Sequence, residues 1–410
     1  MKLFDILAIL VTFSALFSYL NHRFLRFPRS IGLMLIAIVL SLLVTILGWL
    51  GLGIDDATIS LVARIDFNRA LMGGMLSFLL FAGALHVNGG ELAANKWTIG
   101  LLASVGLLAS TLLVGTLSWL ILPAVGFPLP FLYCLLFGAL ISPTDPVAVL
   151  SILQSSGIPR SLQAKISGES LFNDGVGVVV FSVLLEIASQ DSPVGIEDVV
   201  GLMAREALGG VLLGLATGYL AYRMMKSIDS YQVEVLITLA LVTGGYSLAM
   251  KLHTSGPICV VVAGLMIGNQ GRRLAMSQSS REHLDDFWEL VDEILNGVLF
   301  VLIGLEVLIL SFTTRYLFLA LLIIPVVIGA RFVTVGVPVT LMRFFRDFSP
   351  GAVRIITWGG LRGGISVALA LSLPAGPERA LILPLTYCVV VFSILVQGLS
   401  MGWLVRRHQF

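Results

Sequence analysis

Residues 138–149 read GALISPTDPVAV, and two prolines, Pro143 and Pro146, enclose Thr144 and Asp145 in this apolar stretch. Proline lacks a backbone N–H and disfavours helix at the residue before it. A helix that enters this stretch must therefore break around Thr144 and Asp145. The break predicts free carbonyl oxygens beside a carboxylate, which together suit a hard cation. The structural alternative is a simple proline kink in which Asp145 caps the second half-helix.

The rest of the chain is also apolar. Its 410 residues are 57% hydrophobic and 12% charged, and the mean hydropathy is +1.00. Soluble domains carry about 25% charged residues, so the composition excludes an ordinary soluble enzyme and a disordered protein. Lys and Arg number 25 against 24 Asp and Glu, which leaves no basic excess for nucleic acid. The three cysteines lie in apolar runs without metal-binding spacing.

A bilayer span needs about 20 mostly apolar residues. The sequence therefore predicts an all-α polytopic membrane protein with about thirteen transmembrane helices. The first span is followed by polar residues rather than by a cleavage site, so we expect it to be retained. The approximate limits of the predicted spans are 3–20, 31–51, 68–86, 97–121, 129–153, 163–188, 199–224, 232–250, 254–270, 289–311, 315–342, 352–373 and 379–404.

The basic residues divide unevenly between the two sides that these spans define. Sixteen of the 25 Lys and Arg residues fall on one set of connectors and seven on the other. Cytoplasmic connectors carry the excess of positive charge, so we expect the N-terminus outside and the C-terminus in the cytoplasm. Only a few residues follow the last span, and we expect no C-terminal soluble domain.

The span 163–188 carries several polar side chains at membrane depth. Ser170 and Asp174 are four residues apart and share one helix face, while Glu169 and Asn173 share the adjoining face. An ionisable side chain inside a membrane is costly and usually marks a pathway. Asp174 is therefore a candidate ion site. The alternative is a structural carboxylate paired with a basic residue, for which Glu169 is the better candidate.

The span 352–373 contains four glycines around Arg362, which predicts a second interrupted helix. We expect Glu169 to pair with Arg362, and the alternative is an arginine satisfied by backbone carbonyls alone. Glu306 and Arg331 could pair with each other in a structural role. Spans five and twelve cross the membrane in opposite directions, which is typical of inverted repeats with two crossed discontinuous helices and a site at the bilayer midplane.

These segments resemble the monovalent cation:proton antiporter family, which includes bacterial NhaP-type exchangers and animal sodium/proton exchangers. The resemblance covers essentially the whole chain and implies a homodimer with a mobile core bundle and a scaffold bundle. The motifs that carry it are residues 142–149, 168–175, 287–306 and 359–364. It implies a scaffold and dimerisation bundle at 1–87 and 227–312, an ion-binding core at 88–190 and 313–410, and a linking helix at 191–226.

The resemblance also assigns roles residue by residue. It implies that Asp174 binds both the cation and the proton, with the Thr144 carbonyl and the Ser170 hydroxyl as further ligands of Na⁺. Asp145 would act nearby. Asn173 is the neutral residue that stands where electrogenic relatives have an aspartate.

The resemblance further implies that Glu169 and Arg362 brace Asn173 and the half-helices. One position departs from the pattern, because several relatives supply a glutamate to the ion site from span three. Ala82 occupies that position here and offers no oxygen ligand. A water molecule or Asp145 could take its place.

The predicted function is secondary active transport, an electroneutral exchange of Na⁺ or Li⁺ for H⁺ across the cytoplasmic membrane by alternating access. A K⁺/H⁺ antiporter with the same mechanism and a cation channel are the alternatives. A membrane sensor is disfavoured by the expected lack of an output domain, and an organic-anion symporter by the acidic pair at the break. We expect no enzymatic activity, no cofactor and no nucleic-acid partner.

Overall fold

The computed structural model describes residues 3–50, 67–145, 153, 159–189, 195–308, 314–344, 348 and 351–407. Within these ranges the chain is helical, and its only paired extended backbone is one isolated antiparallel bridge between Asp145 and Leu361. The prediction of an all-α protein is confirmed for this part of the chain.

Several helices continue through a short π-helical or 3₁₀ turn, labelled η. The N-terminal half contains α1 (Leu3–Leu20), η1 (Asn21–Leu25), α2 (Arg29–Trp49), α4 (Phe67–Ala70), η2 (Leu71–Met75), α5 (Leu76–His86), α6 (Gly89–Leu101), η3 (Leu102–Gly106), α7 (Leu107–Ala124), α8 (Phe131–Ile141), α10 (Arg160–Ser189) and α11 (Ile196–Met225). The C-terminal half contains α12 (Tyr231–Lys251), α13 (Gly256–Met266), η4 (Ile267–Gly271), α14 (Arg272–Leu274), α15 (Gln278–Leu305), η5 (Glu306–Leu308), α16 (Thr314–Met342), α17 (Ala352–Gly359), α18 (Gly364–Ser372), α19 (Pro377–Phe392), η6 (Ser393–Gln397) and α20 (Gly398–Arg407).

Each of the thirteen predicted spans coincides, at least in part, with helix in the described residues. Nine continuous helical segments there are long and apolar enough to cross a membrane. The other four spans differ for identifiable reasons. Two of these spans are interrupted, one containing α8 and the other containing α17 and α18. In the remaining two spans, α13 is short and the first half of α15 carries acidic side chains.

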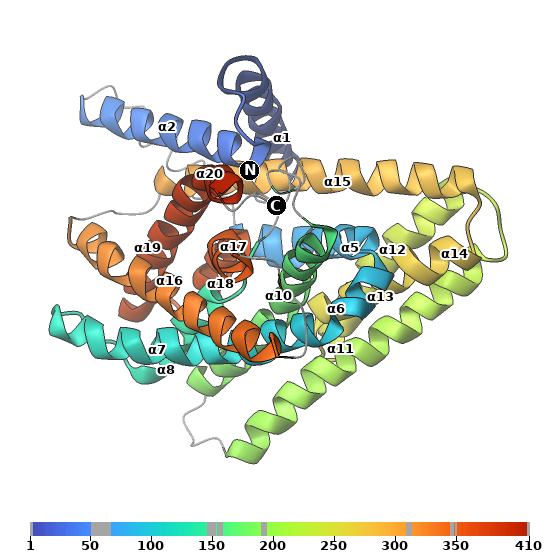
Figure 1. The fold of residues 1–410 in the computed structure, drawn as a ribbon. Helices are drawn as coiled ribbons and strands as arrows, with labels where there is room; N and C mark the ends of the chain where they lie inside the picture. Colours follow the sequence, from blue (N-terminus) through green and yellow to red (C-terminus); the bar gives the residue numbers. More distant parts are fainter. Residues whose placement is uncertain are drawn as a thin grey trace.

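Two groups of helices pack around α10, which lies near the centre of Figure 1. In one group, α13 packs on α5, α11 and α12, while α15 packs on α1, α2 and α5. In the other group, α16 packs on α7, α17 and α19, and α7 packs on α8. Because α10 contacts α13 as well as α6 and α8, it links the two groups.

Small residues allow the closest helix approaches. A Cβ atom at Gly214 of α11 would lie 2.5 Å from the Cys259 carbonyl oxygen of α13. A Cβ atom at Gly138 of α8 would likewise collide with the Thr111 carbonyl oxygen of α7. Lipid tails are as apolar as leucine, so helices in membranes associate through such close packing rather than through a hydrophobic driving force.

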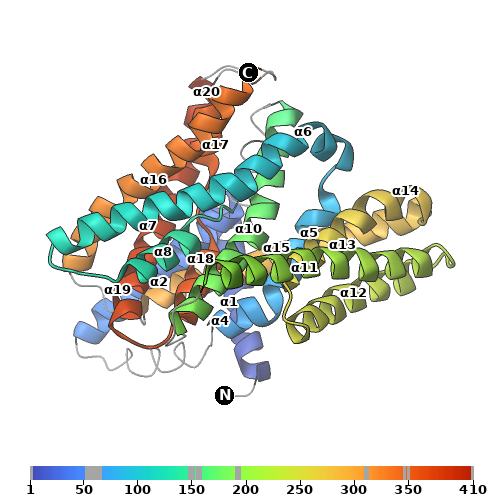
Figure 2. The ribbon, with the colours of Figure 1, turned by 90° about the horizontal axis from the view of Figure 1, so that it is seen from below.

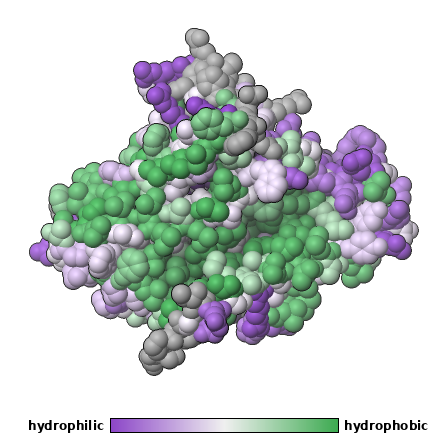
Figure 3. Space-filling model, turned by 60° about the horizontal axis from the view of Figure 1, so that its bottom comes forward, coloured by the Kyte–Doolittle hydropathy of each residue, from purple (hydrophilic) through white to green (hydrophobic). Residues whose placement is uncertain are grey.

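The surface is that of a membrane protein. Figure 3 shows hydrophobic residues over most of the face in view, with hydrophilic residues gathered towards its margins. Many large apolar side chains are exposed, among them Leu212, Leu236 and Leu321. In Figure 2, α20 ends near the C mark and α1 begins near the N mark, at opposite ends of the molecule. An odd number of membrane crossings requires such an arrangement.

Candidate functional site

Two helices are interrupted where they meet. The first, α8, ends at Ile141, and the chain continues in non-helical conformation to Asp145, the last residue described before a gap. The second interruption separates α17 from α18 at residues 360–363. The Asp145 N–H donates a hydrogen bond of 2.7 Å to the Leu361 carbonyl, which forms the isolated antiparallel bridge. The predicted crossing of two interrupted segments is therefore confirmed within the described residues, which follow the first segment as far as Asp145.

Arg362 satisfies the carbonyls that the first interruption frees. Its guanidinium donates to the carbonyls of Ser142 and Pro143, the latter at 3.0 Å. Its own backbone N–H donates to the Ser393 hydroxyl at 3.0 Å. The arginine is buried, so its positive charge lies directly at the carbonyl end of α8, where the helix dipole is negative.

Helix α10 holds the other side of the first interruption. The Thr144 N–H donates to Asn173 Oδ1 at 3.2 Å, and Asn173 Nδ2 donates to Thr144 Oγ1 at 2.8 Å. The Ser170 hydroxyl donates to the Thr144 carbonyl. All three residues are buried. The structure thus brings the Thr144 carbonyl and the Ser170 hydroxyl, the two oxygens expected to bind one ion, next to each other.

Asp174 and Asp145 complete an acidic pair beside these oxygens. Asp174 is 9% exposed, and its charge interacts with that of Asp145. Asp145 in turn packs on Gly363, where a Cβ atom would lie 2.6 Å from the Asp145 Cβ. Pro143 packs on Gly177 of α10 in the same manner. The glycines of both motifs therefore allow the interrupted segments and α10 to meet closely enough to place two carboxylates together.

The expected ion pair of Glu169 with Arg362 does not form, although the charge of Glu169 acts on Arg362. The pairing that the sequence allowed between Glu306 and Arg331 does not form either. Arg331 of α16 forms an ion pair of 2.5 Å with Glu169 instead, and both side chains are buried. Arg362 is occupied by carbonyls, which is the alternative that the sequence left open. The physical reason is geometric, because Arg362 lies at the end of α8 while Arg331 reaches α10 from a third helix. Glu306 is buried at the far end of α15 and interacts with Arg379.

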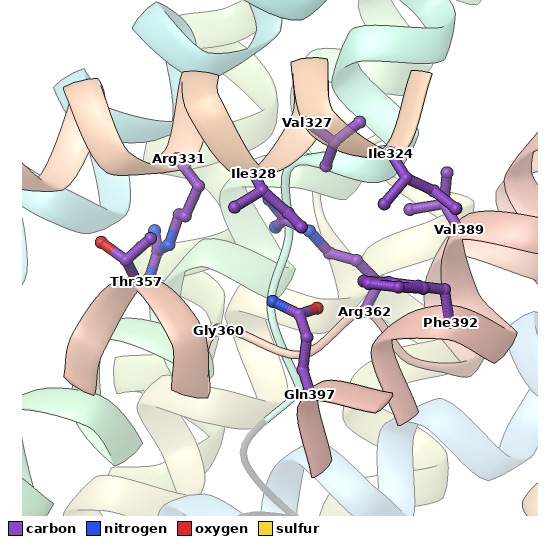
Figure 4. Close-up of a pocket in the computed structure, with 10 residues that line it drawn as sticks. All are labelled: Ile324, Val327, Ile328, Arg331, Thr357, Gly360, Arg362, Val389, Phe392 and Gln397. Carbon is purple, nitrogen blue, oxygen red and sulfur yellow. The ribbon is translucent and has the colours of Figure 1, made fainter. Parts of the chain in front are cut away.

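Arg331 and Arg362 border one small cavity of about 10 Å³, shown in Figure 4. The cavity also contacts Thr357, Gly360 and Gln397. Its volume suits about one water molecule and is too small for a larger substrate. In Figure 4, Arg331 extends from its helix towards Thr357 of α17, which places a positive charge beside the carbonyl end of that half-helix.

The structure places two further residues that bear on the site. Ala82 is buried on α5, and at the neighbouring Gly83 an added Cβ atom would lie 3.7 Å from the Leu171 side chain of α10. Asp292 of α15 lies close enough to Asp145 for their charges to interact. Asp292 was not among the predicted site residues, although it is an ionisable residue inside the predicted span 289–311, and the same signal identified Asp174 in its span. Residues 146–152, including Pro146 and the expected second half-helix, lie outside the described residues.

Known proteins resemble this chain over nearly its whole length. A family model described as "Sodium/hydrogen exchanger, transmembrane" matches residues 10–407. The Na⁺/H⁺ antiporter NhaP of Pseudomonas aeruginosa is 51% identical over 408 residues, which are 98% of this chain and 96% of that protein. The Na⁺/H⁺ antiporter NhaH of Halobacillus dabanensis is 34% identical over 94% of this chain and 93% of its own length.

The fold also matches a solved structure. The sodium proton antiporter MjNhaP1 from Methanocaldococcus jannaschii, solved at pH 8, superimposes with a TM-score of 0.78. The match covers 98% of each chain at 19% sequence identity. At this identity the likeness establishes the fold alone.

Proposed function

Because this chain belongs to the sodium/hydrogen exchanger family, we propose that it exchanges Na⁺, or Li⁺, for H⁺ across the cytoplasmic membrane by alternating access. One observation carries the proposal. The buried carboxylate of Asp174 lies beside an interrupted helix, where the Thr144 carbonyl accepts a hydrogen bond from the Ser170 hydroxyl of α10, so that two oxygens suited to a cation lie side by side. Relatives that are named Na⁺/H⁺ antiporters match nearly the whole chain, which supports the same reaction here.

Asp174 couples the two ions by competition. Burial disfavours the charged form of a carboxylate, so a proton and a cation both gain by neutralising it. Asp145 adds a second negative charge nearby, which favours the capture of a cation. Each ion excludes the other from Asp174. An empty site would carry a bare charge through a medium of low dielectric constant, so the unloaded return is blocked and leakage is prevented.

Asn173 makes the exchange electroneutral. Its amide group is fully engaged with Thr144, donating through Nδ2 and accepting through Oδ1. It therefore fixes the Thr144 carbonyl for the ion without contributing a titratable charge. With Asp174 as the single carrier of exchange, one proton moves for each cation. Transport in liposomes that changes strongly with an imposed membrane potential at fixed ion gradients contradicts this stoichiometry.

The two packing groups correspond to a scaffold and a mobile core. Residues 1–87 and 227–312 form the scaffold, which also contacts a second copy in a homodimer, and residues 88–190 and 313–410 form the core. The helix of residues 191–226 connects them. The N-terminus lies outside and the C-terminus in the cytoplasm. This arrangement is supported by the position of α10 between the two groups and by the uneven distribution of basic residues.

The decisive experiment measures exchange in proteoliposomes for Asp174→Asn. The substitution keeps the size of the side chain and removes its charge, and we expect exchange to be abolished while the protein stays folded in detergent. Asp229→Asn removes an exposed carboxylate after α11 and serves as the matched control, with exchange unchanged. Substantial exchange by Asp174→Asn would place the ion site elsewhere.

The same assay identifies the cation. Proton flux is followed while Na⁺, Li⁺ and K⁺ are added in turn. We expect a response to Na⁺ and Li⁺. A response to K⁺ alone would support the K⁺/H⁺ antiporter, whereas single-channel currents would support a cation channel.

A further inference from the structure

The link between α1 and α2 encloses a basic hollow. Its volume is about 850 Å³, and the residues that give it its character are Tyr19, His22, Arg23, Arg26, Phe27 and Arg29. None of the described residues that line it is acidic. Because it lies in the scaffold and far along the chain from the interrupted helices, the ion site does not account for it.

The hollow has a fixed shape. Asn21 is buried, and its side chain clamps the backbone of Phe27 by donating to the Phe27 carbonyl at 3.0 Å and accepting from the Phe27 N–H at 3.3 Å. The Arg26 N–H donates to the Asn21 carbonyl at 2.7 Å. Gly32 of α2 lies so close to the Asn21 side chain that no Cβ atom would fit there. The link between the two helices, residues 21–28, is therefore held in one bent conformation, which we call the hook.

Arg26 adopts a strained conformation in this hook. Its φ of 56° lies in the left-handed region, which non-glycine residues seldom adopt. Such strain persists where the surrounding structure enforces it, and it occurs preferentially at functional positions. Here it keeps Arg26 in the wall of the hollow together with Arg23, and both arginines are exposed.

The charges of the hollow differ in their availability. Arg29 is already paired with Glu293 of α15. Within the described part of the chain, no hydrogen bond or ion pair engages the guanidinium group of Arg23 or of Arg26. Guanidinium groups bind phosphate oxygens in a bidentate manner, so two exposed arginines on a rigid hook suit a phosphate group.

The surroundings of the hollow are those of a membrane surface. Tyr19 is 63% exposed and Phe24 is 71% exposed, and both flank the basic side chains. On α2, the exposed side chains of Val39 and Leu42 continue the apolar surface. A soluble anion would use only the arginines, whereas a phospholipid would use the arginines and this apolar surface together. The distribution of basic residues assigns the link to the cytoplasmic side, where anionic lipids gather.

We propose that this hook binds the headgroup of an anionic phospholipid of the cytoplasmic leaflet, with its phosphate on Arg23 and Arg26 and its acyl chains against the apolar side chains beside them. The site rests on the proposed orientation of the chain but not on the proposed transport reaction. Its occupancy stabilises the scaffold, because α2 connects to α15 through the Arg29–Glu293 pair and through the Ser41 hydroxyl, which donates to the Gly304 carbonyl at 3.0 Å.

The test is native mass spectrometry of the full-length protein in a neutral detergent with added phosphatidylglycerol, phosphatidylcholine or inorganic phosphate. The test variant combines Arg23→Gln with Arg26→Gly. Glycine suits the left-handed conformation at residue 26, so this substitution removes the guanidinium without disturbing the hook. The matched control is Arg406→Gln combined with Arg407→Gln, a second pair of exposed arginines, at the end of α20.

We expect the unmodified protein and the control to retain phosphatidylglycerol in preference to phosphatidylcholine. In the test variant we expect that preference to fall about 30-fold, which corresponds to about 1 kcal/mol for each basic side chain. Equal retention of the two lipids, or an unchanged preference in the test variant, would overturn the proposal. Displacement of the lipid by inorganic phosphate at similar concentration would show a site for free phosphate instead. Exchange by the unmodified protein is measured in parallel in liposomes that contain phosphatidylglycerol, and its absence there bears on the proposed function alone.

Discussion

The two interrupted helices reach the same extended geometry by different means. Residues 142–145 leave the helix at prolines, which remove hydrogen-bond donors, and they keep hydroxyl and carboxylate oxygens. Residues 360–363 leave the helix among glycines, and their only polar side chain is that of Arg362. The first interruption can therefore offer oxygens to a cation, while the second can only offer positive charge. The first interruption has the oxygen groups that a cation-binding site needs. The second interruption supplies Arg362, which neutralises the carbonyl end of α8 beside that site.

The charges at the crossing follow this division. Arg362 lies at the carbonyl end of α8, and Arg331 lies beside Gly360 at the carbonyl end of α17. Asp145 packs on Gly363, at the N-terminal end of α18. Each of these three helix ends thus meets a side chain of opposite charge, as the helix dipole favours. The following substitutions test how much each part of this arrangement contributes.

The largest loss of stability is expected for Glu169→Gln. It leaves the buried charge of Arg331 without its partner, and breaking a buried ion pair costs about 3–5 kcal/mol. The free energy of unfolding is measured in mixed detergent micelles. Glu293→Gln, which breaks the exposed pair with Arg29, is the control and should cost no more than about 1 kcal/mol. If both substitutions cost the same, Arg331 does not depend on Glu169 for its charge balance.

Arg362→Gln is expected to cost about 1.5–3 kcal/mol, because hydrogen bonds from a charged donor to the Ser142 and Pro143 carbonyls are lost. The same unfolding measurement applies. Arg362→Lys restores the charge without the planar geometry of two donors and should recover part of the loss. An unchanged free energy of unfolding in Arg362→Gln would mean that residues 360–363 do not stabilise the interruption at residues 142–145.

Gly363→Ala is expected to cost about 1–2 kcal/mol by overpacking against Asp145. Because the displaced group is a proposed ion-site carboxylate, the apparent affinity for Na⁺ should also fall in a proteoliposome assay. Gly329→Ala is the matched control, since a Cβ atom there meets open space and alanine favours the helix of α16. Equal stability and equal apparent Na⁺ affinity in the two variants would show that the close contact with Gly363 does not position Asp145.

The smallest effect is expected for Thr144→Val, about 1 kcal/mol, because only the acceptor of the Asn173 amide is lost. The Thr144 carbonyl stays in place, so the apparent affinity for Na⁺ should change little. Thr144→Ser keeps the hydroxyl and should behave like the unmodified protein. Loss of Na⁺ binding in Thr144→Val alone would assign the hydroxyl, rather than the carbonyl, to the ion.

The sequence predicts the crossing well because its causes are local. Two prolines around Thr144 and Asp145 must interrupt a helix wherever it lies, and the helical spacing of Ser170 and Asp174 fixes their common face. The order of the spans then determines that the two interruptions run in opposite directions. These inferences need no knowledge of which helices touch.

The choice of partners could not be predicted in the same way. Arg331 lies in an apolar run with no local signal, and only the packing of α16 brings it to Glu169 rather than to Glu306. The position of Arg362 on two carbonyls likewise depends on how closely the glycines let the segments approach. Asp292 carried a readable signal, because it is an ionisable residue inside the predicted span 289–311, but it was not singled out as a site residue.

The backbone hydrogen bond between Asp145 and Leu361 has a mechanical consequence. It fastens the two interrupted segments to each other, and the contacts of Asn173 and Ser170 fasten the first of them to α10. The two interrupted segments cannot separate from each other, or from α10, without breaking these hydrogen bonds. In the proposed exchange, a bound ion would therefore move together with the whole crossing, relative to the helices of the proposed scaffold.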